Sequence, residues 1–456
     1  MNDELLNGSV FKSLMLFAIP FMLSNLLQVL YGAADLFVVG HFATTSDVSA
    51  VSIGSQTMAM LTNLILGFTT GITVLLGQFF GAKKEKELAA TVGSSVVLFT
   101  MIAVTISIIL FLTNHQIVGL MHTPNDAISA TRSYLYICSL GTVFIVGYNA
   151  VSAILRGLGD SKTPLLFVAI ACVINVIVDF ILVDGYQMGA AGAAIATVLA
   201  QAGAFIFSLI YLKYKGLGFK FNRQDISFNL PMIAKITKVG LPIGLQSALV
   251  GISFLLITVI VNGMGLVASA SVGVVEKLIE FLMLPAIALG NAVATMTAQN
   301  FGAEQYSRAY KSMRYGIAFC LSISLIVTVV CQFDGSIFTR IFSSDQAVIK
   351  NAALYLQTYS FDCLCTSFIF CYNGYLNGGG YTVFTMLHSL LATFILRIPL
   401  TLVISKLSGI TLFHMGIASP IASMASIIMC VIYIRYLNRS YYFNFFAYLY
   451  KIYYMR

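Results

Sequence analysis

Two aspartates in apolar segments are the residues of this chain best suited to chemistry inside a membrane. Asp35 lies in the apolar run from Pro20 to Gly40, and Asp179 lies in a second run, LLFVAIACVINVIVDFILV, with Asn175 one helical turn before it. An acid at the centre of a membrane helix costs about 2.5–3.5 kcal/mol, so such acids usually face a cavity and mark an ion or substrate path. The pattern therefore predicts that both carboxyls line such a path.

Asp35 shares its helix face with two further polar residues. Gln28, Tyr31 and Asp35 stand at positions i, i+3 and i+7, which places an amide, a phenol and a carboxyl on one side of a helix. For Gln28 and Tyr31, a stripe that joins this helix to a neighbour is an equally good interpretation. For Asp35 we favour a functional one.

An oxygen-rich ion site is the chemistry that these residues suggest together. Thr197 stands in the small-residue segment AAGAAIATVLAQ, where helices approach closely. With Asp35, Asn175 and Asp179 it supplies two carboxyls, an amide oxygen and a hydroxyl, a set suited to a shared proton or a hard cation such as Na⁺. Two carboxylates in one low-dielectric pocket cannot both ionise at low cost, so the pair is expected to hold a proton. Two unrelated acids that join helices remain the alternative.

The composition excludes a soluble domain. Apolar residues make up 59% of the 456 residues, charged residues 9%, and the mean hydropathy is +0.92. So few charges cannot cover a globular surface. The continuous apolar runs predict an all-α polytopic membrane protein and disfavour a barrel.

The apolar runs predict twelve transmembrane helices. The expected spans are 13–39, 49–79, 89–112, 127–151, 163–183, 190–212, 233–262, 268–298, 311–333, 347–372, 383–405 and 413–436. With the N-terminus in the cytoplasm, most lysines and arginines fall on the cytoplasmic side. The opposite side holds Arg132, Arg340, Lys350 and Lys406, while Lys277 and Arg397 lie within spans. Both termini are therefore predicted to be cytoplasmic.

The chain also repeats itself at an interval of 221 residues. Gly77-Gln78-Phe79-Phe80-Gly81-Ala82 returns as Ala298-Gln299-Asn300-Phe301-Gly302-Ala303, and LRGLG from Leu155 returns as LNGGG from Leu376. Six spans per half predict two six-helix lobes related by a pseudo-two-fold along the membrane normal, as alternating access requires. The predicted parts are an N-lobe (1–212), a cytoplasmic linker (213–232), a C-lobe (233–440) and a cytoplasmic tail (441–456).

The two halves differ in their polar residues. Asp35, Asn175 and Asp179 correspond to leucines in the second half, which places the ion chemistry in the N-lobe. Asp362, in SFDCLCTSF, is the strongest cavity candidate of the second half. The group of Glu276, Lys277 and Glu280 fits a structural ion-pair cluster as well as part of the cavity. Arg397 is expected to neutralise an acid or to cap a kink before Pro399.

Several of these motifs together resemble the multidrug and toxic compound extrusion (MATE) family. They are the first span with Asp35 followed by Val39-Gly40, the GQFFGA stretch, NAVSAILRGLGDSKTP from Asn149 to Pro164, and AQNFGAE. Each motif is loose alone, but their order and spacing are specific and cover nearly the whole chain.

The resemblance implies a cation-coupled antiporter, and specifically the DinF-type or MepA-like bacterial branch. In that branch N-lobe aspartates with asparagine and threonine partners bind the proton or Na⁺, which matches Asp35, Asn175, Asp179 and Thr197. The NorM-type branch has a glutamate in span seven, and this chain has no acid there. A C-lobe ion site is therefore not expected, although Asp362 resembles that branch's aspartate in span ten.

The expected function is H⁺- or Na⁺-coupled export of organic, mostly cationic amphipathic compounds from the bacterial cytoplasm by a monomer in the cytoplasmic membrane. Besides the coupling ion, no cofactor is expected; the partners are small-molecule substrates and membrane lipids, without nucleic acid. The expected substrate-cavity residues are Gln28, Tyr31, Tyr134, Asn149 and Asp362. A lipid-linked oligosaccharide flippase of the wider superfamily is the alternative. An integral-membrane enzyme is a remote one, because the sequence has no HExxH, no GxSxG and no paired histidines.

Overall fold

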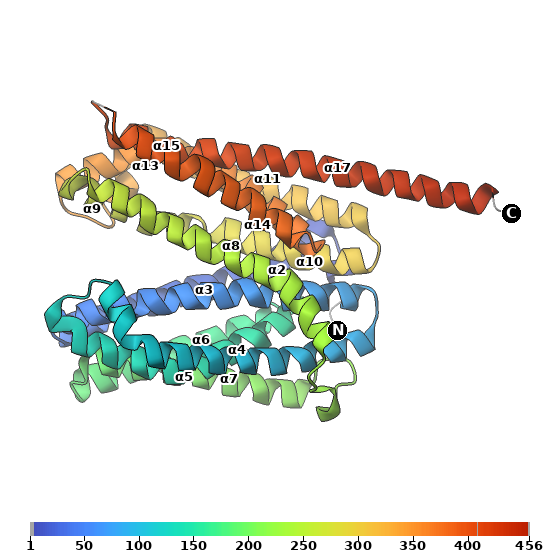
Figure 1. Ribbon diagram of the computed structural model, residues 1–456, viewed down its shortest axis with the longest axis horizontal. Coiled ribbons are helices and arrows are strands. Elements are labelled where there is room, and N and C mark those ends of the chain that lie inside the picture. The colour runs from blue at the N-terminus through green and yellow to red at the C-terminus, as the bar shows by residue number, and fades with distance from the viewer. Residues whose placement is uncertain (1–3, 408, 455–456) are drawn as a thin grey trace. The chain divides into compact units, whose positions relative to one another are not determined.

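The computed structural model describes residues 4–407 and 409–454, and every regular element among them is a helix (Figure 1). The elements before the linker are α1 (Glu4–Asn7), α2 (Val10–Phe42), α3 (Thr45–Gly81), α4 (Glu85–Leu120), η1 (Asn125–Ala127), α5 (Ile128–Gly157), α6 (Lys162–Asp179), η2 (Phe180–Gly185) and α7 (Gly189–Lys215). The later ones are η3 (Arg223–Asp225), α8 (Leu230–Asn262), α9 (Leu266–Leu282), α10 (Leu284–Gly302), α11 (Tyr306–Asp334), α12 (Ser336–Thr339), α13 (Gln346–Gly378), α14 (Thr382–Leu390), η4 (Leu391–Arg397), α15 (Ile398–Ser405), α16 (Leu412–Met415) and α17 (Ala418–Tyr454).

The helices confirm an all-α, multi-pass membrane protein with two lobes of six spans. Ten helices or joined helices of the described part are long and apolar enough to cross a bilayer. The other two predicted spans are α13, which carries more polar residues, and the eighth span, which is divided at Met283 into α9 and α10. Large apolar side chains such as Leu112 and Ile326 are exposed, as expected of a surface that lipid covers.

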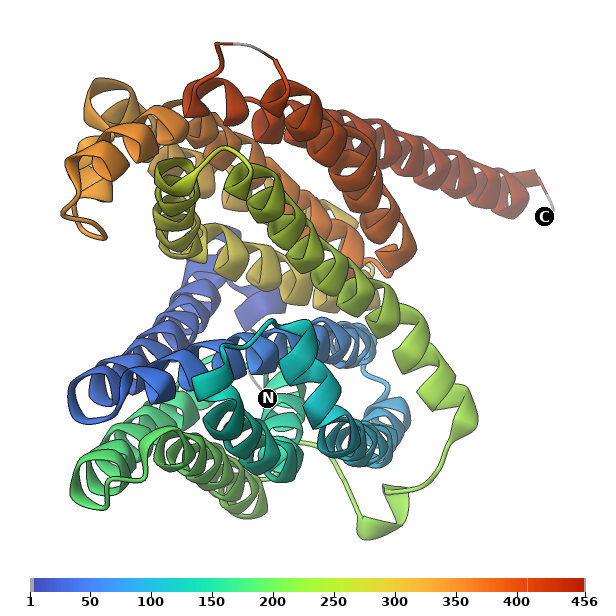
Figure 2. The ribbon, with the colours of Figure 1, turned by 60° about the vertical axis from the view of Figure 1, so that its left-hand side comes forward.

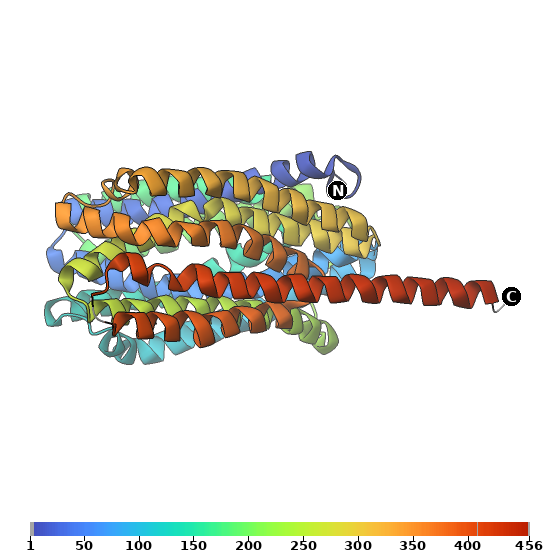
Figure 3. The same cartoon turned by 90° about the horizontal axis from the view of Figure 1, so that it is seen from above.

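Contacts between residues divide the chain into two compact units that do not follow the two halves of the sequence. Unit 1 contains Met1–Gly251, Leu284–Gly316 and Asn373–Thr385, and unit 2 contains Ile252–Met283, Ile317–Tyr372 and Met386–Arg456. Within unit 1, α5 packs against α4 and α7, and α7 packs against α6 (Figure 2). The predicted lobe and linker boundaries stay predictions. The predicted tail continues helix α17 as far as Tyr454 (Figure 3).

The repeated glutamines explain why the two sequence motifs recur. Within unit 1, Gln78 Nε2 donates a hydrogen bond to the carbonyl oxygen of Gly378 at 2.9 Å. Gln299 Nε2, 221 residues after Gln78, donates to the carbonyl oxygen of Gly157 at 3.0 Å. Gly157 and Gly378 are themselves 221 residues apart, so the two bonds are equivalent. We call this pair of bonds the glutamine brace.

Glycines allow α3 and α10 to approach closely enough for the brace to form. A Cβ at Gly81 would overlap the carbonyl oxygen of Gln299, and a Cβ at Gly302 would overlap that of Gln78. Only glycine avoids this overlap, because the opposing atoms belong to the main chain. The GQFFGA and AQNFGA motifs therefore serve a close helix crossing in unit 1.

We expect Gly81→Val to lower the thermal unfolding midpoint of the detergent-purified protein clearly, by an overpacking cost of about 1–3 kcal/mol or more. The matched control is Gly119→Val in α4, where a Cβ would meet nothing within 4 Å. Helical circular dichroism during heating gives both midpoints. Equal midpoints for the two variants would contradict the account of the crossing.

Candidate functional site

The four residues predicted to bind the coupling ion lie together in unit 1. Thr197 Oγ1, on α7, donates a hydrogen bond to Asp35 Oδ2, on α2, at 3.2 Å. The side chains of Asn175 and Asp179, both on α6, lie next to the Asp35 carboxyl. Three helices therefore bring these residues together, and we call them the Asp35 cluster. Its role in ion binding stays a prediction at this point.

The Asp35 cluster is buried and short of hydrogen-bond donors. Asp35 is 4% exposed, and Asn175 and Asp179 are 0% exposed. Within the described part of the chain, Asp35 Oδ1, both Asp179 carboxyl oxygens and both polar atoms of Asn175 lack a hydrogen-bond partner. Buried polar groups are normally paired, since leaving one unpaired costs about 1–3 kcal/mol.

No base compensates the two carboxyls. Among the described residues, no ion pair joins a lysine, arginine or histidine to Asp35 or Asp179. Two adjacent buried carboxylates repel one another, and this repulsion disappears when they share a proton or a bound cation. The oxygens of the cluster, with the Thr197 hydroxyl, are the ligands that a hard cation prefers.

Helix α6 changes its winding directly after the cluster. It ends at Asp179 and continues as the π-helix η2 over Phe180–Gly185. π-Helical turns are rare and often occur at functional sites. Facing α6, the helix α7 is lined by buried alanines and glycines, and a Cβ at Gly192 would lie 3.2 Å from Leu182. Small residues thus allow α7 to approach closely enough for Thr197 to reach Asp35.

Tyrosines and one further amide adjoin the Asp35 cluster. Gln201 Nε2 donates to Tyr31 OH at 3.5 Å, and Tyr31 lies near Asp35. Sequence reasoning missed Gln201, although its position one turn after Thr197 on α7 was a usable signal. Tyr134, 2% exposed, lies near Asp35 and Thr197, and its ring leaves no room for a side chain at Gly54.

The remaining predicted cavity residues of unit 1 are less closely involved. Asn149 is buried, and its Nδ2 donates to the carbonyl oxygen of Ile145 in its own helix at 2.8 Å. Among the described residues it makes no hydrogen bond to the Asp35 cluster. Gln28 is half-buried on α2. Substrate contact by either residue stays a prediction.

Unit 2 holds a second polar cluster, which includes a base. Asp362, 3% exposed on α13, lies beside Tyr359 and near Arg397. Arg397 donates to Tyr359 OH at 3.5 Å and lies 4.5 Å above the centre of the Phe254 ring. Sequence distance alone gave no sign that Arg397 approaches Asp362.

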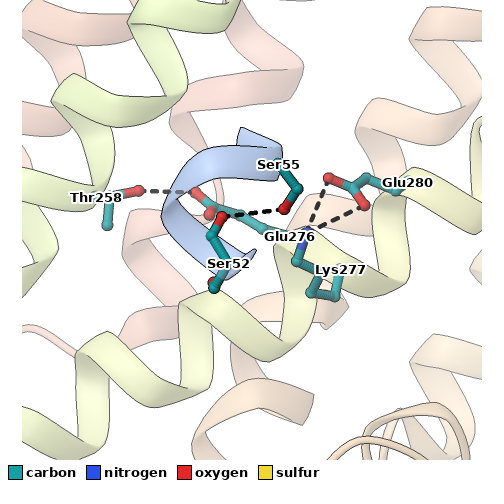
Figure 4. A network of polar contacts seen from close by, with 6 residues as sticks. All are labelled: Ser52, Ser55, Thr258, Glu276, Lys277 and Glu280. Atoms are coloured by element: carbon teal, nitrogen blue, oxygen red, sulfur yellow. Dashed lines mark hydrogen bonds and ion pairs between the residues drawn. The ribbon is translucent and has the colours of Figure 1, made fainter. Parts of the chain in front are cut away.

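The structure separates the three charges of α9. Thr258 Oγ1 donates to Glu276 Oε1 at 3.1 Å, while Lys277 Nζ pairs with Glu280 Oε1 at 3.3 Å (Figure 4). The Lys277 and Glu280 side chains are 66% and 56% exposed, so solvent weakens their pairing. Glu276 instead is partly buried and faces Arg397.

We expect Asn175→Leu to raise the thermal unfolding midpoint while it weakens any ion binding by the Asp35 cluster. The substitution removes two unpaired buried polar atoms and adds apolar contact. Ion binding is measured as protection against thermal unfolding when Na⁺ or pH is varied.

The control is Asn114→Leu, also buried in unit 1, where Nδ2 donates to the Arg132 carbonyl oxygen at 2.9 Å. Here we expect a loss of about 1 kcal/mol of stability and unchanged ion protection. A lowered midpoint for Asn175→Leu with intact ion protection would indicate that Asn175 only supports the fold.

Comparison with known proteins places this architecture. The MatE family model matches residues 20–181 and 242–403. The "Probable multidrug resistance protein YpnP" of Bacillus subtilis strain 168 is 30% identical over 403 residues, 88% of this chain and 90% of YpnP. The "Multidrug export protein MepA" of Staphylococcus saprophyticus is 26% identical over 95% of this chain and 97% of MepA.

A solved structure has the same fold. It is the "Outward-facing conformation of a multidrug resistance MATE family transporter of the MOP superfamily", with a TM-score of 0.89 and 20% identity over 96% of this chain and 98% of that one. The family model covers the same six-span pattern twice, in agreement with the internal repeat. The chain belongs to the multidrug and toxic compound extrusion (MatE) family of membrane transporters.

Proposed function

We propose that this transporter exchanges H⁺ or Na⁺ for organic, mostly cationic amphipathic compounds and so exports them from the cell. The observation that carries the proposal is the pair of buried carboxyls, Asp35 and Asp179, without a basic partner among the described residues. The relatives whose names describe multidrug resistance or export support the class of cargo.

The Asp35 cluster suggests how an ion drives the cycle. With a proton between Asp35 and Asp179, or Na⁺ bound by their oxygens, α2 and α6 attract one another through the site. Loss of the ion leaves two like charges, which favours separation or repacking of these helices. Thr197 holds Asp35 in position, and Asn175 supplies an amide oxygen. Ion and cargo couple if each favours a different conformation of the cavity.

Location and assembly follow from the charge pattern. The excess of lysine and arginine in one set of loops supports cytoplasmic termini in a bacterial cytoplasmic membrane. We propose that the protein works there as a monomer among membrane lipids. A lipid-linked oligosaccharide flippase would carry an anionic pyrophosphate, which the acids of the Asp35 cluster disfavour.

We expect an imposed H⁺ or Na⁺ gradient to drive ethidium movement in proteoliposomes, and we expect Asp35→Asn to reduce this movement to less than about a tenth. Testing each gradient alone identifies the ion. The matched control is Asp184→Asn, which makes the same change at an exposed acid in η2 and should leave transport intact. Movement of labelled lipid-linked precursors, with no response of several organic cations to either gradient, would favour the flippase.

A further inference from the structure

Arg397 is a cation within a membrane span, and its neighbours show where its charge acts. It is the last residue of the π-helix η4 and precedes Ile398–Ser405. A charge at this depth costs about 2.5–3.5 kcal/mol unless it has partners, so its surroundings require an explanation.

Two acids of unit 2 face the guanidinium from different helices. Asp362 approaches from α13, and Glu276 approaches from α9. Neither lies within ion-pair distance of Arg397 among the described residues, so the interaction acts across a short gap. Asp362 Oδ1 has no hydrogen-bond partner in the described part of the chain. Arg397 thus balances acids that it does not fully pair.

Aromatic rings complete the surroundings of Arg397. The guanidinium lies over Phe254 and donates to Tyr359 OH, and Tyr355 stacks at 5.6 Å from Tyr359. Carboxylates beside aromatic faces are what proteins use to bind organic cations. In unit 2, however, a residue of the chain itself already lies on the Phe254 face.

We propose that Arg397 acts as a tethered cation that occupies the position of a second positive charge at Glu276 and Asp362, so that the transporter disfavours dications relative to monocations. The inference rests on the proposed export of organic cations. Glu276, Thr258 and Arg397 are partly exposed, so a substrate charge is able to approach them. A dication then meets the like charge of Arg397, whereas a monocation bound elsewhere does not.

Ethidium and propidium provide a matched pair of probes, because they share one fluorescent ring system and carry one and two positive charges. Equilibrium binding of each dye to the purified, detergent-solubilised full chain gives a ratio of dissociation constants. We expect Arg397→Gln to shift this ratio toward propidium by about tenfold, which corresponds to about 1.4 kcal/mol. Arg397→Lys, which keeps the charge, should leave the ratio close to that of the wild type.

Two further variants separate charge balance from damage to the fold. Lys277→Gln removes a positive charge from the same unit, but this charge is two-thirds exposed, and the ratio should change less than twofold. Glu276→Gln removes a negative charge and should shift the ratio away from propidium. This variant also tests the inference if Arg397→Gln fails to fold.

The outcomes distinguish the inference from the proposed function. An unchanged ratio in folded Arg397→Gln, or an equal shift in Lys277→Gln, would overturn the role of Arg397 while ethidium transport by the wild type still stands. If Glu276→Gln alone is available, an unchanged ratio overturns the role. A wild type that neither binds nor transports either dye rejects organic-cation export itself, and the inference falls with it.

Discussion

The close crossing of α3 and α10 is the constraint on which the rest of unit 1 depends. Two glycines remove every side-chain atom from the crossing, and the glutamine brace then joins each motif to a glycine carbonyl of the other repeat. Helices α2 and α5 pack against this pair, and they carry Asp35 and Tyr134. The position of the ion cluster is thus set by a crossing whose residues perform no ion chemistry themselves.

The two units treat buried acids in opposite ways. In unit 1, Asp35 and Asp179 lie side by side without a base, an arrangement that only an external proton or cation neutralises. In unit 2, Arg397 faces Asp362 and Glu276 and provides part of the compensation from within the chain. A repeated scaffold therefore carries two different electrostatic devices, in agreement with the leucines that replace the acids of the first half in the second.

Much of this organisation was predictable from the sequence, and the exceptions share a physical cause. Continuous apolar runs gave the twelve spans, and helical periodicity together with the family resemblance gave the clustering of Asp35, Asn175, Asp179 and Thr197. The π-helices η2 and η4 and the break at Met283 were not predicted, because local winding depends on packing against neighbouring helices. The approach of Arg397 to Asp362 was missed because it joins helices far apart in the chain.

The glycine crossing also limits how the two repeats are able to diverge. At Gly81 the obstacle is the carbonyl oxygen of Gln299, and at Gly302 it is that of Gln78. Both are main-chain atoms, which every amino acid at positions 78 and 299 would retain. No second mutation at these positions can make room for a side chain, so compensatory evolution is closed here. After duplication of an ancestral half, the ion-binding residues were free to drift apart, whereas each copy of this glycine had to be kept on its own account.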